Sequence, residues 1–65
     1  MPSTVIRRFD YEDRRNELII QFQSGRRYAY FNVPPDIYQG LRAARSRGTF
    51  FNDCVRNRYP CNRLD

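Results

Sequence analysis

The stretch that decides the fold is LIIQFQSGRRYAY, residues 18–30, in which two alternating runs flank a Ser-Gly pair. The apolar residues Leu18, Ile20 and Phe22 fall on every second position, which is typical of a strand with one buried face. A second run of the same kind covers residues 26–32. Two such runs joined by a short loop containing glycine predict an antiparallel β-hairpin.

The length of the loop decides on which face of the hairpin the two tyrosines lie. A two-residue Ser-Gly loop would pair Ile20 with Ala29 and place both tyrosines outside, whereas a three-residue loop over residues 23–25 pairs Ile20 with Tyr28. Two-residue loops favour Asn-Gly, Asp-Gly or a leading glycine, so we predict the longer loop with its glycine left-handed. The predicted core face is Leu18, Ile20, Phe22, Tyr28 and Tyr30, and the predicted outer face is Ile19, Gln21, Arg27, Ala29 and Phe31.

Residues 4–11 are rich in β-branched and aromatic side chains and predict a strand before the hairpin. Ile6 and Phe9 are three positions apart, which breaks strict alternation, so we expect a β-bulge near Arg7-Arg8. The polar stretch 12–16 predicts the turn that follows. The sheet is therefore expected to be a three-stranded antiparallel meander.

Two helical patterns follow the sheet. Pro35 suits the first turn of a helix and Asp36 complements its positive end, which predicts a helix over residues 35–45. Ser46 is a candidate cap for a second helix that runs to about Asn57. The apolar residues expected on the two helices are Ile37, Leu41, Ala44, Phe50, Phe51, Cys54 and Val55. The βββαα order predicts an α+β fold in which both helices pack on one face of the sheet.

The composition indicates one folded domain over residues 1–65. Ten aromatic residues and a hydrophobic fraction of 40% are too rich for a disordered chain. A chain of this size buries only roughly 60% of the surface that its unfolded form exposes, which leaves room for one thin core. No apolar run approaches the length of a membrane span or of a signal peptide. We therefore expect a cytoplasmic protein with no membrane partner.

The residue types needed for catalysis and metal binding are scarce. Histidine is absent, which removes the commonest general base and zinc ligand. Cys54 and Cys61 have neither zinc spacing nor the pattern of a disulfide framework, and they are expected to be reduced thiols. Glu12 and Asp13 are adjacent on a turn and cannot face each other across a cleft. We predict no enzymatic activity, no metal site and no cofactor.

Charge is the strongest chemical feature of the sequence. The chain has twelve arginines, no lysine and seven acidic residues, for a net charge of +5 and a pI near 9.9. Residues 42–63 carry six arginines against Asp53 alone, whereas residues 1–33 carry six against four acids. Such a stripe suits a phosphate backbone, and the alternative is a solvated basic face that only keeps the protein soluble. We predict nucleic-acid binding, to RNA in preference to duplex DNA.

The sequence Ser46-Arg47-Gly48 opens the second predicted helix, where unpaired backbone N–H groups attract anions. Gly48 would let a phosphate approach the backbone closely; the alternative is an ordinary serine cap followed by a glycine needed for close helix packing. The residues predicted to bind nucleic acid are Arg42, Arg45, Ser46, Arg47, Gly48, Arg26, Arg27, Arg56 and Arg58.

The aromatic residues permit two interpretations. The pair Tyr28 and Tyr30 is similar to a base-stacking platform on a sheet, but the predicted register turns both rings toward the core. Phe31 and Tyr38 are then the candidates for stacking on bases. The competing function is protein–protein interaction, in which the outer sheet face docks a protein partner or a second copy of the chain through Ile19, Ala29 and Phe31.

An ordered set of residues gives the chain a resemblance to a known family. The set comprises Tyr11-Glu12, the pattern within residues 18–30, Val33-Pro34, and Ala44-x-Ser46-x-Gly48-x-x-Phe51-Asn52. It resembles the KTSC domain, a small bacterial domain named for its occurrence at the C-terminus of some lysyl-tRNA synthetases and also found as a stand-alone protein. The resemblance covers residues 3–60, and the synthetase fusion implies RNA binding. Arg47 stands where relatives often carry lysine, and Cys61 where they often carry an aromatic residue.

Overall fold

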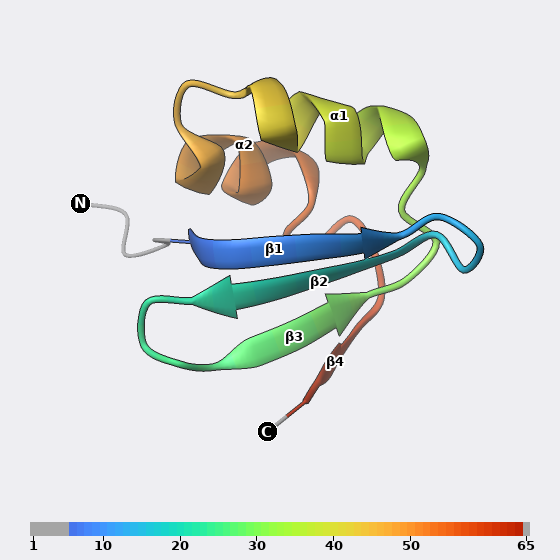
Figure 1. Ribbon diagram of the computed structural model, residues 1–65, viewed down its shortest axis with the longest axis horizontal. Coiled ribbons are helices and arrows are strands. Elements are labelled where there is room, and N and C mark those ends of the chain that lie inside the picture. The colour runs from blue at the N-terminus through green and yellow to red at the C-terminus, as the bar shows by residue number, and fades with distance from the viewer. Residues whose placement is uncertain (1–5, 65) are drawn as a thin grey trace.

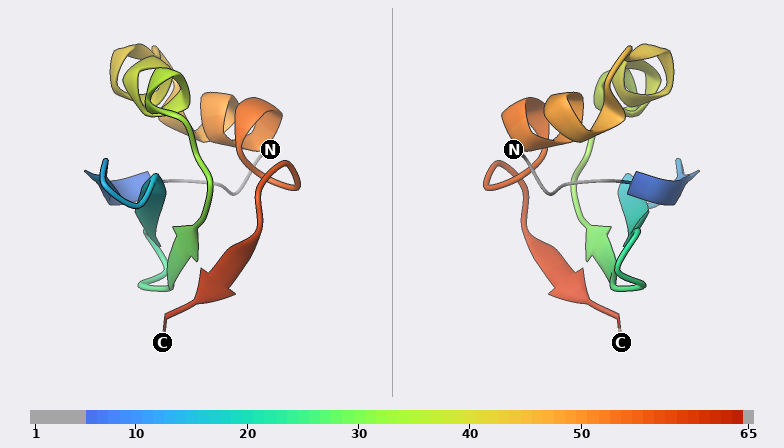
Figure 2. Two further views of the ribbon diagram at one scale, coloured as in Figure 1. Left: turned by 90° about the vertical axis from the view of Figure 1, so that its right-hand side faces the viewer. Right: turned by 90° about the vertical axis from the view of Figure 1, so that its left-hand side faces the viewer.

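Four antiparallel strands and two helices make up the part of the chain that the computed structural model describes, residues 6–64 (Figure 1). The sheet has the order β1-β2-β3-β4, and both helices lie on the same side of it (Figure 2). The predicted α+β class and the meander followed by two helices are confirmed. The elements are β1 Ile6–Glu12, β2 Glu17–Phe22, β3 Arg27–Tyr30, α1 Pro35–Ala43, α2 Arg47–Cys54 and β4 Cys61–Arg63.

The hairpin between β2 and β3 has the predicted three-residue loop. The Phe22 N–H donates to the Arg26 carbonyl at 2.9 Å, and the Gly25 N–H donates to the Phe22 carbonyl at 2.9 Å. Gly25 has a φ of +97°, in the left-handed region that glycine adopts without strain. The register pairs Ile20 with Tyr28, as predicted.

Strand β1 contains the predicted bulge. Ile6 pairs with Phe22 and Arg8 pairs with Gln21, so one extra residue is inserted between them. The strand continues to Glu12, one residue beyond the predicted end. The first two residues of the predicted strand, at positions 4 and 5, lie outside the described residues.

The sequence did not predict β4, so the expected three-stranded sheet is wrong by one strand. Residues Cys61–Arg63 pair with β3, and the flanking hydrogen bonds run from Phe31 N–H to the Pro60 carbonyl and from Leu64 N–H to the Arg27 carbonyl. All three residues of β4 are exposed. They therefore show no alternation of buried and exposed side chains, which is the signal that a sequence pattern can detect.

Both helices begin where predicted and end earlier. Pro35 is the first residue of α1, and Ser46 caps α2 by accepting a hydrogen bond from the Thr49 N–H at 3.3 Å. Helix α1 ends at Ala43, two residues early, because Ala44 is extended and turns the chain toward α2. Helix α2 ends three residues early, and the left-handed Asn57 reverses the chain after it.

The two helices pack closely at a glycine of α1. A Cβ added to Gly40 would lie 2.5 Å from Cζ and 2.9 Å from Cε2 of Phe50, on α2. Those separations are shorter than any ordinary carbon–carbon contact. The absence of a side chain at position 40 is therefore what lets the Phe50 ring sit against α1.

The core lies between the helices and the face of the sheet beneath them. Its buried side chains are Leu18, Ile20, Tyr30, Val33, Leu41, Phe51 and Val55. Tyr30 is 6% exposed, and its ring meets that of Phe51 edge to face at 5.3 Å. Tyr28 lies on the same face, half-buried, beside Tyr30 and Phe22. The predicted placement of both tyrosines on the core face is confirmed.

The outer face of the sheet departs from the prediction at Ala29, which is 0% exposed. Strand β3 is an inner strand, and Ala29 is paired with Ile19 on one side and with Asn62 on the other. The larger side chains of these neighbours surround its single methyl group. Ile19 and Phe31 are themselves half-buried, so the apolar outer face is smaller than predicted.

No helix among the described residues is long and apolar enough to cross a bilayer.

Candidate nucleic-acid interface

The helix junction, residues 42–48, brings together five of the predicted site residues. Arg42 lies in the last turn of α1, Arg45 and Ser46 form the connection, and Arg47 begins α2; all four are exposed. The Ser46 hydroxyl is engaged locally, since it accepts from the Thr49 N–H and donates to the Thr49 hydroxyl at 3.0 Å. The capping role predicted for Ser46 is confirmed, and the charge of the junction comes from its arginines.

Two of these arginines lie over aromatic rings. The guanidinium carbon of Arg47 is 5.2 Å from the ring centroid of Phe9, on β1. That of Arg42 is 5.8 Å from the ring centroid of Tyr38, on α1. Both distances fall within the range of a cation–π contact. The strand therefore contributes to the junction through Phe9, a residue that sequence analysis did not assign to the site.

Tyr38, a predicted stacking residue, already makes aromatic contacts within the protein. Its ring stacks on that of Tyr11, with the ring centroids 4.7 Å apart and an angle of 11° between the ring planes. It meets the Phe9 ring edge to face, with the centroids 6.0 Å apart. The Tyr11 hydroxyl donates to the Val33 carbonyl at 2.7 Å. Burial, and then the charge of Asp13, raise the pKa of Tyr11, so this hydroxyl keeps its proton. The Tyr38 ring thus supports Arg42 with one face committed to Tyr11.

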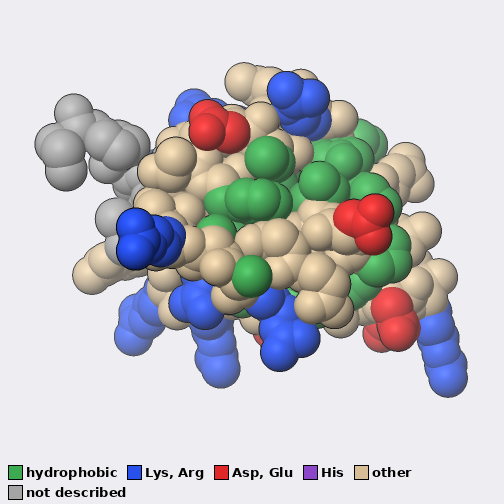
Figure 3. Space-filling model, turned by 90° about the horizontal axis from the view of Figure 1, so that it is seen from above, with side chains coloured by type: hydrophobic (Ala, Val, Ile, Leu, Met, Phe, Trp, Pro, Cys, Tyr) green, Lys and Arg blue, Asp and Glu red, His purple; other side chains and the backbone are tan. Residues whose placement is uncertain are grey.

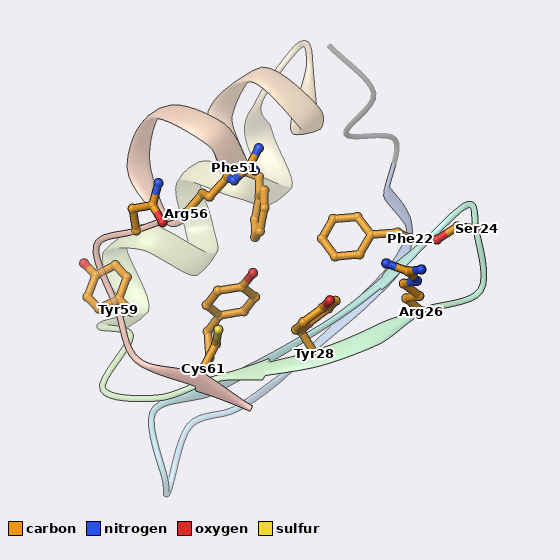
Figure 4. Close-up of a pocket in the computed structure, with 10 residues that line it drawn as sticks. Phe22, Ser24, Arg26, Tyr28, Phe51, Arg56, Tyr59 and Cys61 are labelled. Carbon is orange, nitrogen blue, oxygen red and sulfur yellow. The ribbon is translucent and has the colours of Figure 1, made fainter. Parts of the chain in front are cut away.

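A second feature is a cleft of about 440 Å³ between the end of the hairpin, the end of α2 and β4 (Figure 4). Five of the ten residues that line it are aromatic, and they come from the sheet, from α2 and from the segment before β4. Arg26 enters from the hairpin, and Arg56 from the turn after α2. The aromatic residues of the wall are Phe22, Tyr28, Tyr30, Phe51 and Tyr59.

The rings of the cleft meet one another edge to face or tilted, never in a parallel stack. The ring plane of Phe22 makes an angle of 70° with that of Tyr28 and 73° with that of Phe51. The ring planes of Tyr28 and Tyr30 make an angle of 37°. The pKa of Tyr30 is raised to about 12, first by burial and then by the neighbouring Cys61 and Tyr28, against the lowering effect of Arg56. The Tyr30 hydroxyl is therefore neutral at physiological pH.

The predicted arginines do not form one continuous stripe. Arg26 and Arg56 both line the cleft, whereas Arg27 alternates with Tyr28 and lies on the opposite face of the sheet. Arg58 Nε donates to the Asp53 carbonyl at 3.0 Å, at the end of α2. Seen from the helix side, arginines stand around the rim of the molecule and hydrophobic side chains show through its middle (Figure 3).

The cleft itself was not predicted as a site. The sequence predicts Phe22, Tyr28 and Tyr30 on the core face of the sheet and Phe51 among the apolar residues of the second helix. It predicts Arg26 and Arg56 among the residues that bind nucleic acid, and it gives Tyr59 no role in a site. The walls come from segments as far apart as the hairpin and β4, and no local spacing links them. The fourth strand, which brings Cys61 and Tyr59 to the cleft, also gave no sequence signal.

Strand order, helix placement and arginine-rich edges define a small α+β domain with a basic, aromatic surface. A family model described as the KTSC domain matches residues 2–59. The chain belongs to the KTSC family. The crystal structure of a KTSC domain protein from Yersinia pestis is similar, with a TM-score of 0.91 and 28% identity, over 100% of this chain and 92% of that one.

Two curated relatives differ greatly in length. A lysine–tRNA ligase of Nostoc punctiforme is 38% identical over 61 residues, which are 94% of this chain and 11% of the ligase. A protein of Tsukamurella paurometabola is 35% identical over 57 residues, 88% of this chain and 85% of that protein. The chain therefore matches a small part of one relative and most of the other.

Proposed function

We propose that this protein is a small, non-catalytic RNA-binding module whose helix junction binds the phosphate backbone through Arg42, Arg45 and Arg47. One observation carries the proposal: Arg42 and Arg47 are each held over an aromatic ring. Among the residues that the structure describes, no carboxylate is within ion-pairing distance of any of the three. Their charge is therefore not neutralised within the protein.

A guanidinium group that rests on a ring keeps its N–H groups at the edge of its plane, where phosphate oxygens can accept them. The ring also restrains the side chain before binding, so less conformational entropy is lost when a phosphate arrives. Each neutralised phosphate releases condensed counterions, which makes the affinity depend on salt. Arg45, between the two supported arginines, extends the same basic surface.

RNA is the favoured partner for two reasons. Half-buried aromatic rings beside arginines suit unpaired bases, which occur far more often in RNA than in duplex DNA. A relative named lysine–tRNA ligase contains a matching segment, which supports an RNA context and, with it, a cytoplasmic location. The non-catalytic part of the proposal rests on the absence of histidine from the sequence. Within residues 6–64, no three Cys, Asp or Glu side chains gather as metal ligands.

The competing protein-docking function has less support. Ala29 is fully buried, and Ile19 and Phe31 are half-buried. Among the described residues, Leu64 at 44% is the exposed large hydrophobic side chain. The outer face thus offers little apolar area for a hydrophobic interface core.

The test is a fluorescence-anisotropy titration against single-stranded RNA, duplex RNA and duplex DNA at two salt concentrations. We expect saturable binding to RNA that weakens steeply with salt. Arg47→Gln should weaken it, whereas Arg14→Gln should not, although it removes the same charge. Arg14 lies on the β1–β2 turn, at the opposite end of the molecule from the helix junction (Figure 1). Equal effects of the two variants would refute the assigned surface, and no RNA binding at low salt would refute the function.

A further inference from the structure

The cleft beside β4 is not explained by binding of a phosphate backbone at the helix junction. It is lined by the hairpin and the end of α2, and none of the junction arginines contributes to it. Its volume of about 440 Å³ falls in the range of roughly 300–1,000 Å³ that small-ligand sites occupy. It therefore has the size of a site for one small group.

The walls of the cleft have the chemistry to hold a flat, electron-rich ring. Its aromatic side chains pack edge to face or tilted, so none of these pairs is stacked face to face as Tyr11 and Tyr38 are. Tyr28 is only half-buried although it lies on the core face of the sheet. A half-buried ring over an open cleft is a surface on which a nucleobase can stack.

The charged residues of the cleft favour an anion. Arg26 and Arg56 lie on opposite sides of the cleft, with Phe51, Tyr28 and Phe22 between them (Figure 4), and no Asp or Glu lines the cleft. Arg56 is steadied by a hydrogen bond from its Nη1 to the Asn52 Oδ1 at 3.4 Å. The neutral Tyr30 hydroxyl adds no negative charge. A planar ring flanked by phosphate is the ligand that this combination fits.

We propose that the cleft binds one unpaired nucleotide, with the base against Tyr28 and its neighbouring rings and the adjoining phosphates on Arg26 and Arg56. The proposal deepens the RNA-binding function, since a strand held at the helix junction would present such a nucleotide. The same chemistry describes a free mononucleotide. A nucleotide within a strand has a phosphate on each side, which matches the placement of the two arginines.

The experiment is a titration of the ¹⁵N-labelled full chain, followed by NMR, with three sets of probes. These are adenosine and AMP, a blunt RNA hairpin, and the same hairpin with two unpaired 3′ nucleotides. We expect the overhang to tighten binding by about 5- to 150-fold, the range for stacking one base. Binding of the overhang should shift the amide signals of Tyr28 and Cys61 of the protein. AMP should bind more tightly than adenosine.

Three variants test the assignment. Tyr28→Leu should abolish the preference for the overhang and leave the affinity for the blunt hairpin unchanged. Arg26→Gln should weaken binding of AMP and of the hairpin with the overhang, whereas Arg14→Gln, on the β1–β2 turn, should not. Arg26 is exposed, so its variant remains informative if Tyr28→Leu fails to fold.

The outcomes separate the two proposals. RNA binding with no preference for the overhang would refute the nucleotide site in the cleft, but it would remain consistent with phosphate binding at the helix junction. AMP binding at the cleft without RNA binding supports the nucleotide site, identifies the free nucleotide as its source and refutes the RNA-binding function. If neither RNA nor AMP shifts the signals of the cleft, the nucleotide site is refuted outright.

Discussion

Replacing Gly40 by alanine is expected to destabilise the protein for a reason that can be reversed at a second position. The new Cβ would lie 2.5 Å from Cζ and 2.9 Å from Cε2 of Phe50, so the ring must move. Overpacking of this kind costs about 1–3 kcal/mol. The higher helix propensity of alanine stabilises a helix interior by about 1 kcal/mol relative to glycine. The net loss for Gly40→Ala is therefore up to about 2 kcal/mol.

Phe50→Leu removes the ring atoms that approach position 40 while keeping an apolar side chain. In that background Gly40→Ala should stabilise the protein by about 1 kcal/mol, because only the helix propensity remains. The two substitutions should thus be coupled by about 1–3 kcal/mol. Urea unfolding of the four proteins, followed by circular dichroism, measures each free energy. If Gly40→Ala has the same effect in both backgrounds, the Phe50 ring is not what requires glycine there.

Three further predictions concern the helix junction and the core. Replacing Arg42, Arg45 and Arg47 together by glutamine should reduce the slope of log affinity for single-stranded RNA against log salt by about 2, at about 0.7 per phosphate contact; an unchanged slope would show that they contact no phosphate. Ser46→Ala should destabilise the protein by about 1 kcal/mol through loss of the α2 cap, and Ser46→Asp should restore most of it, as measured by urea unfolding. The pKa of Tyr30 is raised from 10.0 to about 12, mainly by burial. The stability that depends on the protonated Tyr30 hydroxyl is therefore fully present below pH 10 and is lost as the pH rises to about 12. In Tyr30→Phe the free energy of unfolding should fall less steeply over that pH window.

Local chemistry made much of the fold predictable. Gly25 and the serine before it set the hairpin register, because Ser-Gly is not a pair that favours a two-residue loop, whereas a three-residue loop accepts a left-handed glycine in its last position. The three-residue spacing of Ile6 and Phe9 revealed the bulge. Pro35 and Ser46 marked the helix starts, since each acts on the backbone within a few residues of itself.

Helix ends and the aromatic contacts depended on distant partners. Helix α1 ends at Ala43, where the extended Ala44 turns the chain, and Phe50 of α2 then packs against Gly40. Arg47 lies over Phe9, and Tyr38 on Tyr11, although each pair is separated by more than 25 residues. No periodicity within a helix or strand encodes such a pairing.

The sequence by itself determined the class of fold, the hairpin register and an excess of arginine over residues 42–63. Only the tertiary structure decided that β4 joins β3, that Ala29 is enclosed between two strands, and that Arg26 and Arg56 share a cleft. The physical reason is the range of the interactions. Turn and cap preferences act over a few residues, whereas a cleft exists only where segments far apart in the chain have packed together and left part of their aromatic surface uncovered.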